Sequence, residues 1–365
     1  MKCHAGHPFQ PSGPCAGKKT PCQVIDHCEI LDQFTIGAST PARLSPLGSG
    51  HINETFLVDT NAGRFVLQGI NSDIFPDAVS LMENFSAVTA HLLSKGVTTL
   101  ELIPTVDGVS FHLDAEDHAW RLVRYIENSR SATVPPTPLQ AHSAAEAFGE
   151  FSRHLFDLPQ PNLHEVIPGF HDTPRRLHDF LGAIEVDPER RADGANDEIE
   201  AILEKRDWCT VITEAMAEGA VPERIVHNDA KIDNVLFDIK TGEVVCVVDL
   251  DTVMAGSILH DFGDLVRSAA TTAAEDATNL SRVTLSQDII ERLTAGFLRG
   301  CGDMLTSREH ELIPAAGKLA AYEQAMRFLT DHLLGDPYYR ITRPGHNLDR
   351  ARNQLRLVEL LEEAG

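Results

Sequence analysis

The sequence predicts an α+β protein built from a small strand-rich lobe followed by a mainly helical lobe. Segments rich in β-branched and aromatic residues, separated by glycine turns, are concentrated between residues 42 and 127. Apolar residues then recur at three- and four-residue spacing through most of residues 138–363, which is typical of packed helices. With 365 residues, the chain is long enough for two such units with extensive cores.

The first lobe, residues 29–128, is expected to contain five antiparallel strands and one helix. The helix begins near Pro76, which suits a first helical turn, and ends at Gly96. The strand segments are two that flank a glycine loop within 42–60, then 64–70, 109–114 and 119–127.

The second lobe, residues 129–365, follows a polar, proline-containing boundary near residues 128–136. A short β-rich interruption is expected among its helices, in residues 224–229, 235–238 and 244–251. Helical spacing is found in residues 138–157, 174–185, 196–218, 286–299, 308–334 and 347–363.

The chain is strongly acidic, with 31 Lys and Arg residues against 54 Asp and Glu residues and a formal charge of −23. This charge argues against nucleic acid or an anionic membrane as the main partner, although a local pocket can still bind a small anion. No apolar segment approaches the roughly 20 residues that span a bilayer, and the N-terminus lacks the apolar core of a signal peptide. We therefore expect a cytoplasmic protein.

Residues 1–28 are rich in proline, glycine and lysine and contain four of the seven cysteines. We expect a disordered extension. A zinc site is the alternative, because Cys and His are both zinc ligands, but the short C-x2-C spacing that marks such sites is absent here.

The motif with the most specific chemistry is HNDAKIDN, residues 227–234, followed 15 residues after Asn234 by Asp249 at the end of an apolar strand. Phosphoryl transfer needs a carboxylate that orients and deprotonates the attacking hydroxyl, and oxygen ligands for Mg²⁺. Asp229 suits the first role, and Asn234 and Asp249 suit the second. The alternative is a set of polar loop residues, but the flanking strands and the preceding glycine-loop lobe favour the kinase order of motifs.

These residues resemble the aminoglycoside phosphotransferase and choline kinase superfamily, which has a protein-kinase-like bilobal fold, and more narrowly the bacterial N-acetylhexosamine 1-kinases. The resemblance includes GSGHINETFLV (48–58), VHNDAKIDNVLFD (226–238), VVDLDTVMAGS (247–257) and MRFLTDHLLGDPYY (326–339). It implies an enzyme that uses ATP and Mg²⁺ to phosphorylate the anomeric hydroxyl of GlcNAc or GalNAc. The alternatives are a kinase for an aminoglycoside, choline, ethanolamine or homoserine, and a nucleotide-binding pseudokinase.

The first lobe supplies candidate nucleotide contacts. Backbone N–H groups of Gly48, Ser49 and Gly50 are placed to approach phosphates, although such a hairpin is often only a turn. Gln68 stands where kinases carry a lysine on the third strand, and Glu83 occupies the helix position of its usual partner. Because the sugar 1-kinases also carry glutamine there, we interpret Gln68 as a trait of the subfamily.

The resemblance assigns further residues to the two substrates. It places the backbone of Arg124 to Ile126 at the adenine edge and directs His51 toward the sugar, where a surface histidine is the alternative. It also implies sugar contacts from Arg327 and Tyr338, whereas helical spacing alone would put Arg327 on a solvated or salt-bridged face.

Three other aspartates have expected roles. Asp251, two residues after Asp249, is expected to share its face of a strand and either to bind substrate or to brace the loop through backbone N–H groups. Asp261 and Asp264 are expected to cap and orient a following helix.

Overall fold

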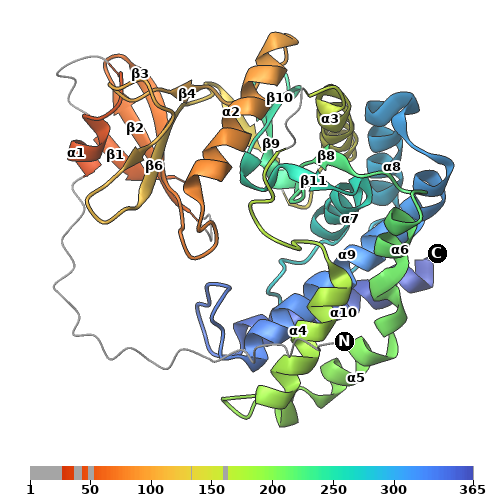
Figure 1. Ribbon diagram of the computed structural model, residues 1–365. Helices are drawn as coiled ribbons and strands as arrows, with labels where there is room; N and C mark the ends of the chain where they lie inside the picture. Colours follow the sequence, from red (N-terminus) through yellow and green to blue (C-terminus); the bar gives the residue numbers. More distant parts are fainter. Residues whose placement is uncertain (1–26, 37–42, 48–52, 133, 159–162, 365) are drawn as a thin grey trace, which may run out of the picture.

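The computed structural model describes residues 27–36, 43–47, 53–132, 134–158 and 163–364, and these form two lobes. One lobe is an antiparallel sheet with helix α2 beside it, and the other contains most of the helices (Figure 1). The predicted α+β architecture is therefore confirmed. No helix in these ranges is both long and apolar enough to cross a bilayer.

The sheet of the first lobe has the strand order β1-β2-β3-β6-β4, with β5 also paired to β6, and every pairing is antiparallel. It has six strands where the sequence predicted five, because β4 is only two residues long and shows no periodicity. The strands are β1 (Arg43–Pro46), β2 (Glu54–Thr60), β3 (Gly63–Gly69), β4 (Leu102–Ile103), β5 (His112–Leu113) and β6 (Ala119–Arg124).

Helix α2 (Ala78–Ser94) packs between this sheet and the second lobe. The Asp77 side chain caps it by accepting a hydrogen bond from the Ser80 N–H at 3.1 Å. Phe85, Val88 and Leu92, spaced on one helical face, are buried in the same hydrophobic cluster as residues of the second lobe. Burial of this face fixes one lobe against the other.

Helix α1 (His27–Leu31) is part of the first lobe and includes the last two residues of the expected N-terminal extension. Ile30 and Leu31 are buried in one cluster with Trp120, and the His27 ring lies 4.5 Å from that of Phe56. The remainder of the expected extension, residues 1–26, lies outside the described residues.

The helices of the second lobe differ from the prediction in two places, and its short strands at Ser129–Ser131 and Met254–Gly256 were not predicted. Residues 196–218 are two helices separated by a 3-10 segment at Arg206–Thr210, and residues 258–269 form a helix, α7, that the sequence analysis missed. Three short strand pairs, β7–β9, β9–β10 and β8–β11, lie among the helices. The helices are α3 (Pro138–Leu155), α4 (Thr173–Val186), α5 (Asn196–Glu204), α6 (Val211–Ala217), α7 (Ile258–Ala269), α8 (Gln287–Cys301), α9 (Ser307–Leu333) and α10 (His346–Ala364). The strands are β7 (Ser129–Ser131), β8 (Arg224–Val226), β9 (Val235–Asp238), β10 (Val244–Val247) and β11 (Met254–Gly256).

Helices α3 and α8 approach each other at backbone contact distance, and glycine makes this possible. A methyl group added at Gly300 would lie 2.1 Å from the Glu146 carbonyl oxygen, and one at Gly296 would lie 2.0 Å from the His142 carbonyl oxygen. The aromatic ring of Phe148 on α3 in turn meets the His227 ring edge-on at 5.2 Å. The α3–α8 contact therefore supports the segment that carries the phosphoryl-transfer motif.

The close contact gives a stability prediction for Gly300→Ala. The added methyl group meets backbone that cannot move independently, so we expect the free energy of unfolding to fall by about 2–3 kcal/mol. Urea denaturation followed by circular dichroism measures this change.

Gly182→Ala is the matched control, because Gly182 is also helical but a methyl group there meets no atom within 4 Å. It is expected to raise the free energy of unfolding by roughly 0.5–1 kcal/mol through helix propensity. Equal effects of the two substitutions would contradict the assigned role of Gly300.

Candidate active site

The segment that carries the phosphoryl-transfer motif, residues 227–234, connects β8 to β9, and the segment with Asp249 connects β10 to β11. Because β8 pairs with β11 and β9 pairs with β10, the two segments lie together where the lobes meet. The Asn234 side-chain N–H group donates to the Asp229 carbonyl oxygen at 2.9 Å, and the Val248 N–H donates to the Asn234 carbonyl oxygen at 2.9 Å. The structure thus brings the three predicted phosphoryl-transfer residues together.

The Asp229 carboxylate is paired with Lys231, whose ammonium nitrogen is 2.8 Å from one oxygen and 3.1 Å from the other. Desolvation acts to raise the pKa of Asp229, but the charge and hydrogen bond of Lys231, together with the charges of His227 and Arg267, outweigh it and hold this pKa below its usual range. The carboxylate is therefore ionised at neutral pH and can accept a hydrogen bond from an acceptor hydroxyl.

Asn234 and Asp249 have the features of a divalent-cation site. The amide nitrogen of Asn234 is held by the Asp229 carbonyl oxygen, and its side-chain oxygen accepts no hydrogen bond from the described residues. Solvent reaches Asp249, yet desolvation by the surrounding protein and the nearby carboxylates of Asp251 and Asp229 raise its pKa to about 7. A carboxylate repelled by its neighbours and an amide oxygen are the hard ligands that Mg²⁺ prefers, so these residues fit the predicted metal.

Asp261 anchors the backbone of the motif. Its fully buried carboxylate accepts the N–H groups of His227 at 2.9 Å and Asn228 at 2.7 Å, and burial raises its pKa to about 6. The prediction that Asp261 and Asp264 cap a following helix was wrong: both lie inside α7, whose cap is Ser257, and Asp264 instead pairs with Arg267 at 2.7 Å.

His227 and Asn228 are fixed by further contacts. The Nε2 atom of His227 donates to the Val248 carbonyl oxygen at 3.0 Å, which leaves Nδ1 to accept the Asp229 N–H at 3.3 Å. Asn228 adopts a left-handed conformation with φ +61°, and its side-chain amide donates to the Thr252 carbonyl oxygen at 3.0 Å. The backbone before Asp229 is thereby constrained on both sides.

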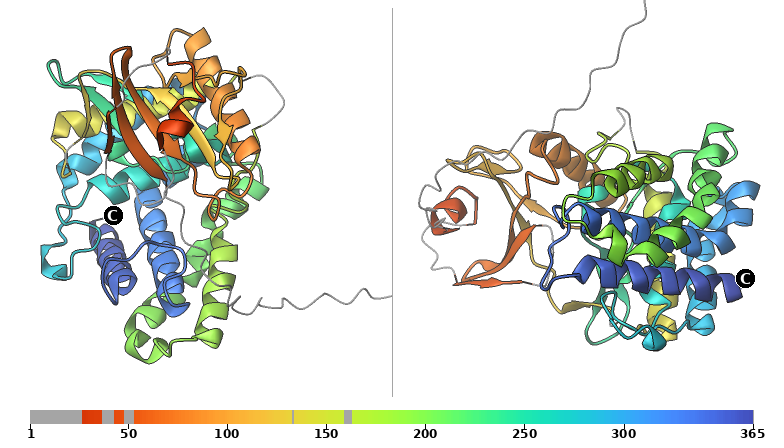
Figure 2. Two further views of the ribbon diagram at one scale, coloured as in Figure 1. Left: turned by 90° about the vertical axis from the view of Figure 1, so that its left-hand side faces the viewer. Right: turned by 90° about the horizontal axis from the view of Figure 1, so that it is seen from below.

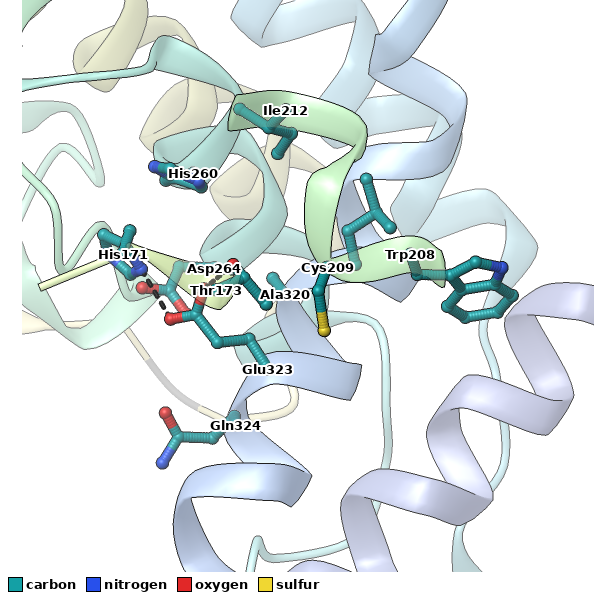
Figure 3. A pocket seen from close by; sticks show the side chains of 11 residues that line it. His171, Thr173, Trp208, Cys209, Ile212, His260, Asp264, Ala320, Glu323 and Gln324 are labelled. Carbon is teal, nitrogen blue, oxygen red and sulfur yellow. Dashed lines mark hydrogen bonds and ion pairs between the residues drawn. The ribbon is translucent and has the colours of Figure 1, made fainter. Parts of the chain in front are cut away.

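A histidine–glutamate pair supports the same backbone from the opposite side. His171 lies 2.8 Å from Glu323 through Nδ1 and 2.9 Å from the Asn228 carbonyl oxygen through Nε2. Thr173 donates to the second oxygen of Glu323 at 2.6 Å, and Figure 3 shows both side chains converging on that carboxylate. Burial opposes protonation of His171, but Glu323 outweighs it and raises the His171 pKa, so the ring can donate through both nitrogens.

Asp251 does not continue a strand with Asp249 as predicted. Strand β10 ends at Val247, Asp249 has φ +62°, and Leu250–Thr252 form a 3-10 turn. The Asp251 side chain is 3% exposed, forms an ion pair with Arg121 and accepts a hydrogen bond from the Asn53 amide at 2.7 Å. It therefore braces the segment that carries Asp249 through side chains rather than through backbone N–H groups.

Gln68 and Glu83 do not form the pair that their positions suggested. The Gln68 side chain accepts a hydrogen bond from Arg121 Nε at 3.0 Å and approaches Thr55 Oγ1 at 3.4 Å. Glu83 is 62% exposed and bonds to His164 at 2.6 Å, away from Gln68.

The other candidate residues have different placements. Gly48, Ser49, Gly50 and His51 lie outside the described residues. The side chain of Arg124 pairs with Glu101 at 2.8 Å, and the Ile126 carbonyl oxygen accepts a hydrogen bond from Ser129.

Arg327 is linked only indirectly to the backbone before Asp229, through Phe170 and His171. Its guanidinium lies 4.9 Å from the Phe170 ring, and Phe170 precedes His171, which contacts the backbone before Asp229. Tyr338 is 43% exposed and its ring stacks edge-on against Tyr339 at 4.8 Å.

Sequence reasoning did not assign roles to Arg121, Lys231 or His171. Lys231, two residues after Asp229, was within the quoted motif, so its spacing was a usable signal. Arg121 and His171 carried no local signal, because their partners are 130 and 152 residues away.

The fold and the site define a kinase-like α+β protein. A model of the phosphotransferase enzyme family matches residues 43–292, and the chain belongs to this family.

Solved structures agree with this fold. A microcompartment-associated aminopropanol kinase is 17% identical, covers 92% of this chain and 96% of its own, and has a TM-score of 0.65. An amicoumacin kinase solved with AMP-PNP and Ca²⁺ is 11% identical, with 88% of each chain covered and a TM-score of 0.60. An aminoglycoside phosphotransferase from Alicyclobacillus acidocaldarius is 11% identical, with coverage of 95% and 97% and a TM-score of 0.60. The kinase-like fold prediction is confirmed.

Asp261→Asn is predicted to impair both stability and turnover. The substituted amide offers only one acceptor oxygen to two buried N–H groups, which costs about 1–3 kcal/mol. We expect a lower melting temperature and a fall in kcat on the order of 100-fold, because the backbone before Asp229 shifts. Asp288→Asn, at an exposed carboxylate 3.4 Å from Arg292 on α8, is the control and should change neither. Normal kcat in the Asp261 variant would contradict the anchoring role.

Proposed function

We propose that this protein transfers the γ-phosphate of ATP to the anomeric hydroxyl of an N-acetylhexosamine, GlcNAc or GalNAc, and forms the sugar 1-phosphate. Membership of the phosphotransferase family supports the reaction class. The grouping of Asp229, Asn234 and Asp249 where the lobes meet supports the kinase chemistry. The resemblance to N-acetylhexosamine 1-kinases in the sequence supports the acceptor.

The observation that carries the choice of acceptor is a pair of arginines beside Phe170. Arg327 lies over the Phe170 ring, and Arg176 donates to the Phe170 carbonyl oxygen at 2.9 Å. Within the described ranges, neither guanidinium has a carboxylate within ion-pair distance. Burial and the charge of Arg327 together lower the pKa of Arg176.

Two arginines without ion-pair partners disfavour a cationic acceptor. An aminoglycoside, choline or an amino alcohol needs acidic or aromatic walls, and a neighbouring guanidinium repels it. A neutral sugar experiences no such repulsion, and its acetamido carbonyl and ring hydroxyls can accept charge-assisted hydrogen bonds from the guanidinium N–H groups. Arg327 and Tyr338 are therefore proposed as sugar contacts, with His51 and Asp251 as further candidates.

In the proposed mechanism, Asp229 accepts a hydrogen bond from the 1-hydroxyl, orients it toward the γ-phosphate and takes its proton. Lys231, beside Asp229, keeps this carboxylate ionised. Asn234 and Asp249 would hold Mg²⁺, which when bound neutralises phosphate charge. The backbone N–H groups of Gly48, Ser49 and Gly50, together with Gln68, are proposed to position the phosphates, and the backbone of Arg124 to Ile126 the adenine. Because the transition state is loose, positioning and electrostatics supply most of the rate.

The substrate class is tested by ADP release in a coupled assay with GlcNAc, GalNAc, glucose, galactose, choline and kanamycin. We expect turnover with the N-acetylhexosamines and much lower rates with the cationic compounds. Asp229→Asn is the matched control, because it removes the base while keeping the side-chain shape and should abolish acceptor-dependent release. Preference for choline or kanamycin would overturn the proposed acceptor. If none of the compounds in the panel caused ADP release, the result would favour a pseudokinase.

Arg327→Ala is predicted to raise the KM for the sugar by roughly tenfold while leaving the KM for ATP almost unchanged, because a charge-assisted hydrogen bond is worth about 1.5–3 kcal/mol. Arg308→Ala is the control, since Arg308 lies on the same helix, is 45% exposed and pairs with Glu311 at 3.0 Å. An equal rise in both KM values would dismiss Arg327 as a sugar contact.

A further inference from the structure

Among the described residues, the first lobe of this protein does not form the ion pair that kinases place between the third strand and the helix. That pair joins a lysine, which also contacts nucleotide phosphates, to a helix glutamate. Here the strand position is Gln68, and Glu83 on α2 is exposed and bonded to His164. A neutral amide supplies no positive charge to phosphates. A cation that replaces the strand lysine therefore has to come from another position.

Arg121 is the buried cation next to this position. In the antiparallel pairing of β3 with β6, Arg121 is the register partner of Gln68. Its Nε donates to Gln68 Oε1 at 3.0 Å, and its guanidinium lies 4.5 Å from the centre of the Phe85 ring on α2. The side chain is 1% exposed. Arg121 therefore lies between the sheet and α2, where the strand lysine of a kinase would project.

The carboxylate partner of Arg121 comes from the segment between β10 and β11 that carries Asp249. Arg121 forms an ion pair with Asp251, whose other oxygen accepts from Asn53 at 2.7 Å. Asn53 follows the glycine-loop segment in sequence and also accepts the Asn71 N–H at 3.0 Å. One guanidinium thus connects β6 with the segment that carries Asp249, and through Asp251 with the start of β2.

Stability alone does not account for such a pair. The cost of desolvating two charges often exceeds their attraction, and apolar residues of similar volume are commonly at least as stabilising. ATP brings negative charge to a site that already holds Asp229, Asp249 and Asp251. A cation between the candidate phosphate-binding strand and the segment that carries Asp249 reduces the resulting repulsion.

We propose that Arg121 is a positioning residue that replaces the strand lysine of kinases from the neighbouring strand. It supplies the positive charge and holds Asp251 beside Asp249. It also orients the Gln68 amide nitrogen, which donates one N–H to Thr55 Oγ1 at 3.4 Å and presents the other to a phosphate oxygen. The inference rests on the proposed use of a nucleotide and not on the identity of the acceptor.

The test measures Mg-ADP binding by isothermal titration calorimetry in the absence of any acceptor. Arg121→Gln is expected to weaken Mg-ADP binding by about tenfold or more, the fold-change that corresponds to 1.4 kcal/mol. Arg121→Lys retains the charge and is expected to recover part of the loss. The transposed variant Gln68→Lys/Arg121→Gln moves the charge to the register partner and is expected to bind at least several-fold more tightly than Arg121→Gln.

Arg43→Gln is the matched control, because Arg43 lies on β1 in the same sheet and is exposed. It should bind Mg-ADP like the wild-type protein. Thermal melting of every variant separates a folding defect from a binding defect. If Arg121→Gln does not fold, the lysine and transposed variants decide the question.

Two results would overturn the inference: wild-type affinity in a folded Arg121→Gln variant, or a transposed variant that regains the melting temperature but not the affinity. The second result would make the ion pair purely structural. Normal Mg-ADP binding by the wild type without phosphorylation of any sugar would instead count against the proposed acceptor and leave the role of Arg121 standing.

Discussion

The two hydrogen bonds that the buried Asp261 carboxylate accepts from the His227 and Asn228 N–H groups are the constraint on which the site depends. They hold Asn228 in a left-handed conformation and set the direction in which the next residue, Asp229, projects. The Asn228 carbonyl oxygen is fixed from the other side by His171. Asp261 on α7 therefore holds this backbone from one side, and the His171–Glu323 pair, whose glutamate is on α9, holds it from the other (Figure 3). Figure 2 shows the two lobes from two further sides.

The acidic character of the chain is distributed unevenly between the site and the surface. Near the junction of the lobes, Asp229 is balanced by Lys231 and Asp251 by Arg121, whereas no cation pairs with Asp249 within the described ranges. An unbalanced carboxylate with a pKa raised to about 7 suits a divalent cation, whose charge would offset the repulsion between ATP and this acidic protein. The proposed Arg121 charge acts in the same direction. Most of the 54 Asp and Glu residues of the chain have no such role and keep the surface solvated.

Sequence patterns predicted helix α3 but missed helix α7 and strand β4. Helix α3 has a clear apolar face and was predicted almost to the residue. Helix α7 has no exposed face: eleven of its twelve residues are buried, including Asp261 and Asp264, so polar residues lie where an amphipathic pattern expects solvent. The two-residue strand β4 is too short to show any period. In both cases tertiary contacts, rather than local propensity, decide the conformation.

The sequence by itself determined the two-lobe order and the chemical identities and spacing of Asp229, Asn234 and Asp249, because these residues lie within one local motif and the turn that follows strand β10. The tertiary structure alone decided which groups are paired. Arg121 meets Gln68 only through the β3–β6 register, and it meets Asp251 across 130 residues of chain. Electrostatic partners are set by distance in space, and no local pattern records a contact between segments that far apart.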